Sequence, residues 1–83
     1  MYIVSGYENM EGKCRNIKPM AVSTKKMAED ILETYANTYM SVAKGFGDAV
    51  VITKSSKEIV VKGSFYEAGY NIDKVELDNI MGA

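Results

Sequence analysis

The chain has 83 residues, of which 47% are hydrophobic and 25% are charged, and its formal net charge is −1. These values are ordinary for a globular domain and exclude both a disordered chain and a strongly basic nucleic-acid binder. With no histidine and a single cysteine, Cys14, the chain has neither an internal disulfide nor the four N or S ligands of a structural zinc site.

The length predicts a single domain over residues 1–83. A domain of this size buries only about 60 to 65% of the surface of its unfolded chain, so its stability margin is small and dimerisation is a common remedy. The segment MYIVSGY is too short and too polar for a signal peptide, and no stretch has the ~20 apolar residues of a membrane span. Together with the unpaired cysteine, these features predict a cytoplasmic protein that does not enter a membrane.

The N-terminal third is expected to form a β-hairpin. Residues 2–7 are rich in β-forming residues and predict a strand, whereas the polar segment 8–12, which ends in glycine, predicts a loop. Residues 13–18 then pair back on the first strand. Alternation puts polar side chains on both faces of this second strand, and Pro19 cannot donate to a ladder, so an edge strand or an irregular segment is expected.

The most regular pattern lies in residues 23–47 and predicts one long helix. Apolar residues recur three and four positions apart along one stripe, at Ala28, Ile31, Leu32, Tyr35, Tyr39, Val42, Ala43 and Phe46. Ser23 is the expected N-cap, with Val22 and Met27 at the spacing of a hydrophobic staple. Gly45 is the residue expected to take the left-handed conformation that ends the helix.

After the helix the pattern changes to that of strands. Residues 48–54 and 57–63 are β-branched runs separated by two serines, which predicts a second hairpin. Residues 63–71 predict either a continuation of that hairpin or an aromatic loop. Residues 72–78 alternate apolar and charged side chains, with Ile72 out of phase, and predict a final strand. The last residues, NIMGA, are expected to be a frayed end or a contact with a partner.

The predicted order is β-(β)-α-β-β-β, an α+β two-layer domain in which one long helix packs on a mostly antiparallel sheet of four to five strands. About 21 helical residues span roughly 32 Å and strands of about six residues span roughly 20 Å, so the helix is expected to overhang the sheet by about two turns. One helix also leaves the second sheet face open, where Val51 and Val60 are expected. Both features predict a homodimer or a surface for another protein; longer strands and a monomer are the alternative.

No motif predicts catalysis, a cofactor, a metal site or a small-molecule substrate. Glu29, Asp30 and Glu33 cluster on the helix but lie off the apolar stripe. Ion pairs from Lys25 to Glu29 and from Lys26 to Asp30 explain these acids better than a carboxylate pair that acts in acid–base chemistry.

Cys14 is flanked by Lys13 and Arg15, which favour a thiolate. Adjacent side chains of a strand point to opposite faces, however, and the chain has no histidine that would act as a base. Cys14 is therefore expected to be a small, buried or half-buried hydrophobe.

Two sets of residues are candidates for binding. Aromatic side chains and the apolar end of the helix predict a protein interface at Met40, Phe46, Phe65, Tyr66 and Tyr70, and alanine at either tyrosine is expected to weaken binding without unfolding the domain. Residues 1–26 carry five basic against two acidic side chains. These cations are candidate nucleic-acid contacts, at Lys13, Arg15, Lys18, Lys25 and Lys26.

The make-up of the whole chain, one compact domain rich in Tyr, Lys and Met without a catalytic motif, resembles the small accessory proteins that bacteriophages and other mobile elements encode. The resemblance implies a non-enzymatic protein that binds and modulates, for instance inhibits, a host or phage macromolecule. The sequence therefore predicts a cytoplasmic interaction protein, homodimeric and with a protein partner. The alternative is a small RNA- or single-stranded-DNA-binding module that uses the basic N-terminal third and neighbouring tyrosines.

Overall fold

A computed structural model describes residues 1–75 of the chain. Its six elements are, in chain order, β1 (Tyr2–Met10), β2 (Lys13–Val22), α1 (Lys25–Gly45), β3 (Val51–Lys54), β4 (Glu58–Lys62) and β5 (Tyr66–Lys74). This order and the two-layer α+β architecture confirm the prediction from the sequence.

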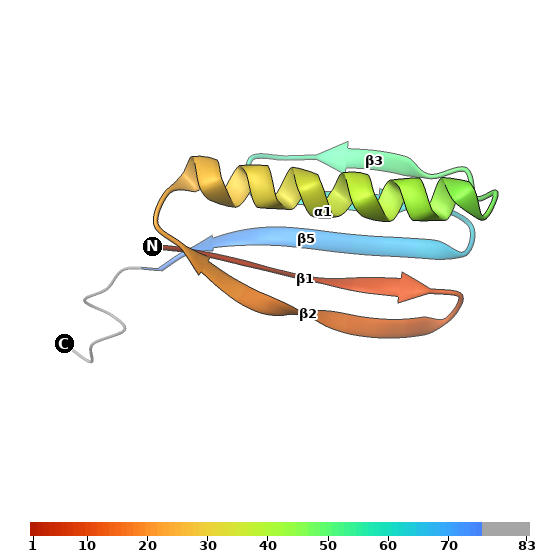
Figure 1. Cartoon of the computed structure of the whole chain (residues 1–83), viewed down its shortest axis with the longest axis horizontal. Coiled ribbons are helices and arrows are strands. Elements are labelled where there is room, and N and C mark those ends of the chain that lie inside the picture. Colours follow the sequence, from red (N-terminus) through yellow and green to blue (C-terminus); the bar gives the residue numbers. More distant parts are fainter. Residues whose placement is uncertain (76–83) are drawn as a thin grey trace.

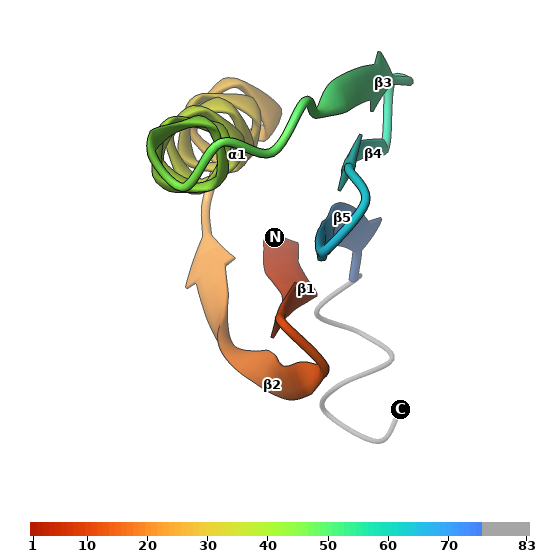
Figure 2. The ribbon, with the colours of Figure 1, turned by 90° about the vertical axis from the view of Figure 1, so that its right-hand side faces the viewer.

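The five strands form one antiparallel sheet in the order β2-β1-β5-β4-β3, and α1 lies along one face of it (Figure 1). The first and last strands, β1 and β5, pair at the centre of the sheet. Seen end-on, the sheet curls around the side on which α1 lies, and β2 and β3 are its two edges (Figure 2).

The first hairpin is longer than predicted. Residues 8–10, expected in a loop, continue β1, and the turn consists of Glu11 and Gly12 alone, with φ of 51° and 85°. Positive φ at both central residues is typical of the tight turn that best matches the twist of a hairpin. The predicted edge position of the second strand is confirmed. A register shift leaves Lys18 and Pro19 together opposite Ser5, which is a β-bulge.

The helix ends differ by one or two residues from the prediction. Thr24, not Ser23, is the N-cap, because its Oγ1 accepts a hydrogen bond from the Met27 N–H at 3.2 Å. At the other end, Gly47 rather than Gly45 has the positive φ, 86°. The Gly47 N–H donates to the carbonyl of residue 44 at 2.9 Å and the N–H of residue 48 to that of residue 43 at 3.0 Å. This pair of bonds is a Schellman motif.

The C-terminal strands are only partly as expected. The hairpin of β3 and β4 is confirmed, and Ile59 and Val61 share its buried face. Residues 66–74, however, form one long strand, so the predicted strand at 72–78 is displaced in sequence and Ile72 is a core residue, 6% exposed. The sequence pattern predicts two separate segments here because glycine and charged residues interrupt the apolar residues of β5. Residues 76–83, including the expected frayed end, lie outside the described part.

The predicted overhang of the helix is wrong. The 21 residues of α1 span about 32 Å. The three strands β1, β2 and β5 have nine or ten residues each and span about 30 to 33 Å. Because helix and strands match in length, the helix lies along the sheet from end to end (Figure 1).

The core lies between α1 and the strands β1, β5 and β4. Small side chains, Ala28, Ala36 and Ala43, are fully buried and let the helix approach the sheet closely. Larger side chains fill the space beside them, namely Val4, Leu32, Tyr39, Ile59, Val61, Tyr66, Tyr70 and Ile72. Removal of this much apolar surface from water is the main stabilising contribution to a domain of this size.

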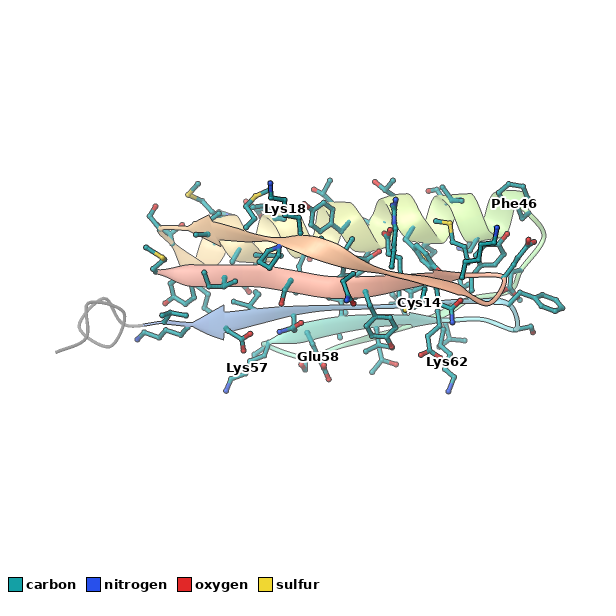
Figure 3. All side chains as sticks on the ribbon, turned by 90° about the horizontal axis from the view of Figure 1, so that it is seen from below. Cys14, Lys18, Phe46, Lys57, Glu58 and Lys62 are labelled. Atoms are coloured by element: carbon teal, nitrogen blue, oxygen red, sulfur yellow. The ribbon has the colours of Figure 1, made fainter. Side chains whose placement is uncertain are left out.

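The opposite sheet face is mostly polar. The Ser5 hydroxyl donates to Asn71 Oδ1 at 3.3 Å, and the Tyr7 hydroxyl donates to Glu67 Oε2 at 2.9 Å. Figure 3 shows Glu58 and Lys62 pointing away from α1. The strand register places Val51 and Val60 on this face, as predicted, with Lys62 and Thr53 directly opposite them.

Candidate functional site

The structure separates the five candidate interface residues into exposed and core positions. Phe46 and Phe65 are 74% and 70% exposed. Met40 is half-buried and packs against the core. Tyr66 and Tyr70 are 5% and 1% exposed and belong to the core, so we expect alanine at either position to destabilise the fold. Both lie on β5, where alternate side chains point into the core.

Phe46 and Phe65 belong to one end of the molecule, which we call the aromatic end. Phe46 follows the last turn of α1, and its ring stacks on that of Tyr66 with a centroid distance of 6.1 Å (Figure 3). Phe65 lies in the turn between β4 and β5, and its carbonyl accepts the Glu11 N–H at 3.2 Å from the tip of the first hairpin. The two phenylalanines flank a shallow hollow of about 640 Å³ whose other walls include Glu11 and Gly12. Three loops therefore meet at this end.

Asp48 holds two of these loops together. Its carboxylate accepts backbone hydrogen bonds from the N–H groups of Ser64, Phe65 and Tyr66, at 3.0, 2.9 and 3.1 Å. These bonds, that of Phe65 first, hold the pKa of Asp48 below its usual value. A side chain at Gly63 would approach Asp48 Oδ2 to 2.4 Å, so glycine there lets the turn close over the carboxylate.

A second buried carboxylate, Glu8, lies on the helix-facing side of β1 and is 8% exposed. Arg15 donates to its Oε1 from Nε at 3.1 Å and from the terminal nitrogen at 2.7 Å, and the Tyr70 hydroxyl donates to its Oε2 at 2.5 Å. Burial raises the pKa of Tyr70, and the hydrogen bond to Glu8 adds to the effect. Tyr70 lies opposite Gly6, where an added side chain would meet the Gly69 carbonyl and the Tyr70 backbone.

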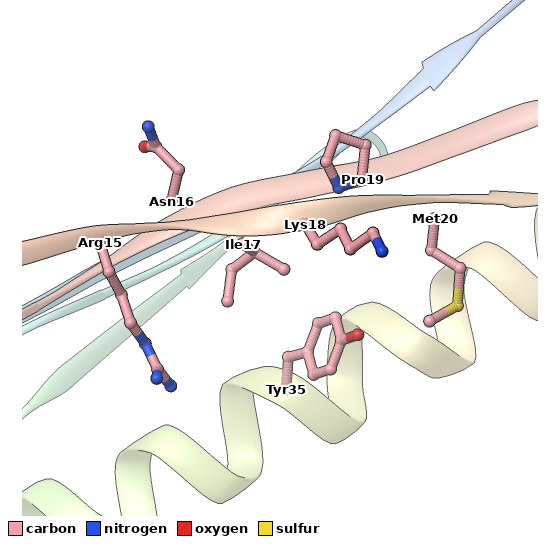
Figure 4. Close-up of a pocket in the computed structure, with 7 residues that line it drawn as sticks. All are labelled: Arg15, Asn16, Ile17, Lys18, Pro19, Met20 and Tyr35. Atoms are coloured by element: carbon pink, nitrogen blue, oxygen red, sulfur yellow. The ribbon is translucent and has the colours of Figure 1, made fainter.

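A groove runs between α1 and β2. One part, of about 460 Å³, is lined by side chains of both elements, including Arg15, Ile17, Lys18, Met20 and Tyr35. Figure 4 shows Arg15 and Ile17 on the side of β2 that faces the helix, with Tyr35 pointing towards β2, while Asn16 and Pro19 lie on the other side. The next part, of about 390 Å³, shares Arg15, Ile17 and Tyr35 and extends along the helix to Thr34, Thr38 and Val42. We call this feature the β2–α1 groove.

The five candidate cations lie on one edge strand and at the start of the helix. Lys13, Arg15 and Lys18 belong to β2, and Lys25 and Lys26 open α1 two residues after that strand ends. Arg15 is engaged by Glu8, and Lys26 lies 3.8 Å from Asp30. The structure thus brings the cations to one side, but two of the five face acids of the same chain.

Cys14 is exposed on β2, so the expectation of a buried or half-buried thiol is wrong (Figure 3). Among residues 1–75 no strand pairs with the outer edge of β2, and Cys14 is exposed there together with its neighbours Lys13 and Arg15. On the helix the predicted pair of Lys26 and Asp30 is confirmed. Glu33 instead pairs with Lys54 of β3 at 3.6 Å. The other predicted pair, Lys25 with Glu29, is not among the ion pairs of residues 1–75, so surface ion pairs account for Asp30 and Glu33 alone.

Sequence reasoning did not identify Glu8, Asp48 or Tyr35 as parts of a site. The sequence predicts a loop at Glu8, whereas the structure places it opposite Ala68 in the central pair of strands, where it accepts a hydrogen bond from Tyr70. An aspartate directly after the glycine that ends a helix is a usable signal for Asp48, since its side chain is free to cap a neighbouring loop.

No protein-family model, curated protein or solved structure matches the chain. In the described part, α1 lacks the apolar character required to cross a bilayer. Residues 1–75 also contain no group of three Asp, Glu or Cys side chains placed to bind a metal ion. The geometry of the two surfaces described above therefore carries the functional argument.

Proposed function

We propose that this chain is a small, non-enzymatic interaction protein of the cytoplasm that binds another protein and modulates it, for instance by inhibition. The observation that supports the proposal most directly is the aromatic end, where Phe46 and Phe65 are 74% and 70% exposed beside a hollow. Aromatic side chains are enriched in protein interfaces, and binding energy is concentrated in a few such anchors.

The aromatic end is also held in place before any partner arrives. Asp48 joins the loop after Phe46 to the turn that carries Phe65 through three hydrogen bonds, and the Phe46 ring rests on Tyr66. A rigid contact surface loses less conformational entropy on binding than a flexible one. Two exposed rings on loops fixed in this way are better explained by partner contact than by folding, since neither ring contributes a buried core position.

The test is the double variant Phe46→Ser/Phe65→Ser against the control variant Met27→Ser. Met27 is 49% exposed and lies in the first turn of α1, at the other end of the helix. Tagged wild type and both variants are used to capture proteins from lysate of the cells that carry the chain. We expect a discrete protein with wild type and Met27→Ser, and at least a tenfold weaker interaction for the double variant, about 1.4 kcal/mol or more. Capture of the same protein by the double variant at wild-type affinity would refute the proposal.

A second copy of the chain remains one of the proposed partners. Because α1 does not overhang the sheet, the helix gives no argument for self-association. The open sheet face is mostly polar, so we expect a homodimer to form through the aromatic end or the β2–α1 groove. Light scattering behind a sizing column measures the mass directly. If wild type is a dimer and Phe46→Ser/Phe65→Ser is a monomer, the dimer contact lies at the aromatic end. If wild type is a monomer, the expected partner at the aromatic end is a different protein.

Nucleic-acid binding is the second candidate, because Lys13 and Lys18 on the edge strand and Lys25 at the start of α1 make no ion pair among residues 1–75. It predicts affinity for single-stranded RNA that falls steeply with salt, because phosphate contacts release counterions. Fluorescence anisotropy with a mixed-sequence RNA at low and high salt measures it. No binding at low salt would remove this candidate.

A further inference from the structure

The helix-facing side of β2 has no covering element in the described part of the chain. Five strands about 4.8 Å apart make a sheet roughly 19 Å wide, and one helix about 10 Å across covers roughly half of that width. The core positions lie on β1, β5 and β4. On β2 the inward side chains are less buried: Met20 is 42% exposed, and Ile17 and Val22 are only half-buried. The uncovered part of the sheet face is divided between its two edges, and on the β2 side it forms one wall of the β2–α1 groove.

The wall that α1 offers to this groove is suited to helix packing. Thr34, Thr38 and Val42 are spaced four residues apart and form one row along the helix on the groove side. Such rows are the ridges by which two helices interdigitate at interaxial distances of about 8 to 10 Å. Threonine and valine are short, so a second helix can approach α1 closely along this row. Tyr35, which lies beside the row, supplies a larger apolar surface to the groove.

The charge on the opposite wall selects the partner. β2 carries Lys13, Arg15 and Lys18 and no acidic residue. Arg15 is neutralised by Glu8, but Lys18 lines the groove and makes no ion pair within residues 1–75. An occupant that places a carboxylate over Lys18 gains an attractive contact, whereas a cation there is repelled.

Other occupants fit less well. Strand addition at the β2 edge is hindered because Pro19 lacks an N–H and the bulge at Lys18 and Pro19 breaks the pattern of edge hydrogen bonds. A stacked nucleotide base is less favoured because Tyr35, the aromatic side chain that lines both parts of the groove, already has one side of its ring against Tyr70 at a centroid distance of 5.7 Å.

We propose that the β2–α1 groove binds an amphipathic α-helix of a partner protein. The apolar side of that helix contacts Ile17, Met20 and Tyr35, and acidic residues at its edge lie over Lys18. The groove uses none of the side chains of the aromatic end, so variants can test the two proposed surfaces independently.

The test uses a display library of peptides about 18 residues long, roughly 27 Å as a helix, presented on a fixed helical scaffold and selected against the full chain. We expect enriched sequences to have apolar residues three and four positions apart and Asp or Glu on an adjoining face. Enrichment of sequences that lack this apolar spacing, enrichment of basic sequences, or no enrichment at all would overturn the proposal.

Variants then place the selected peptide. Lys18→Glu reverses the groove charge, and Lys62→Glu makes the same change at an exposed position of β4 on the other sheet face. Thr38→Glu puts a carboxylate in the groove, and Asn37→Glu puts one on the exposed helix surface next to it. We expect Lys18→Glu and Thr38→Glu to weaken binding by about tenfold or more and both controls to change it by less than about twofold. Thermal unfolding checks that all four variants fold.

The outcome separates this proposal from the previous one. A peptide that binds Lys18→Glu and Thr38→Glu like wild type but is lost in Phe46→Ser/Phe65→Ser binds at the aromatic end, which overturns the groove and supports the proposed protein contact there. Single-stranded RNA that displaces the peptide from wild type, and that Lys18→Glu and Thr38→Glu fail to bind, would overturn the helix proposal in favour of nucleic acid.

Discussion

The hydrogen bond between Tyr70 and Glu8 allows a direct test of how a buried polar contact stabilises this small domain. The Tyr70 hydroxyl donates to Glu8 Oε2 at 2.5 Å, and Tyr70 is 1% exposed and Glu8 8% exposed. Tyr70→Phe removes only the hydroxyl and keeps the ring in the core. It leaves one oxygen of a buried carboxylate without this donor, while Arg15 still binds the other oxygen.

The expected cost follows from the charge of the acceptor. A hydrogen bond to a charged group contributes about 1.5 to 3 kcal/mol, whereas one between neutral groups contributes about 1 kcal/mol. We therefore expect Tyr70→Phe to lower the free energy of unfolding by about 2 kcal/mol. For a chain of this length that corresponds to a fall in Tm of about 8 to 16 °C. In a Glu8→Gln background the same change should cost only about 1 kcal/mol, because the acceptor is then neutral.

Urea unfolding followed by circular dichroism measures this cost, and an unchanged m-value shows that the two-state reference still applies. The matched control is Tyr7→Phe, because Tyr7 makes the same kind of bond to a glutamate, Glu67, at 2.9 Å on the open face of the same sheet. That face is in contact with water, so we expect a change below about 0.5 kcal/mol. Equal losses for the two variants would refute the argument that burial of Glu8 sets the energy.

Two further predictions concern pH. Burial raises the pKa of Tyr39 from 10.0 to about 12. The unfolded chain therefore releases this proton at lower pH than the folded chain, and the free energy of unfolding falls as the pH rises from about 10 to about 12. Urea unfolding at about pH 9 and about pH 11 should show a smaller fall in the free energy of unfolding for Tyr39→Phe than for wild type. The backbone hydrogen bonds to Asp48 lower its pKa, so their stabilisation is present above the usual pKa of an aspartate and is lost as the pH falls through the lowered value. Asp48→Asn should reduce that acid sensitivity and speed amide hydrogen exchange at Phe65 and Tyr66, and unchanged exchange there would contradict the role of Asp48.

Most of the fold could be predicted from periodicity. The stripe in residues 23–47 determines the helix, and the β-branched runs around two serines determine the second hairpin. What periodicity missed were the lengths of the outer and central strands, because polar residues such as Glu8 and Glu67 are paired in the structure and do not show the alternation of a half-buried strand. The homodimer argument depended on those lengths.

The candidate site could be predicted only in part, because exposure depends on register. Phe46 and Phe65 were identified by type, and they are exposed because they lie in loops. Tyr66 and Tyr70 have the same residue type but fall on inward positions of β5. A sequence without a known register cannot separate these pairs, and a one-residue shift would exchange the two faces.

The mixed pattern of β2 also has a physical reading. From the sequence, neither face of residues 13–18 is apolar, which is unusual for a strand inside a sheet that carries a helix. The structure shows why: both faces of β2 contact water in the described part of the chain, because α1 lies mainly over β1, β5 and β4, and Arg15 reaches inward to Glu8. Were β2 merely an edge covered by its own helix, inward positions such as Arg15 would be expected to be apolar. A groove whose occupant has both apolar and acidic side chains requires both apolar and basic side chains on its wall. The mixed pattern of residues 13–18 therefore supports the proposed helix-binding groove.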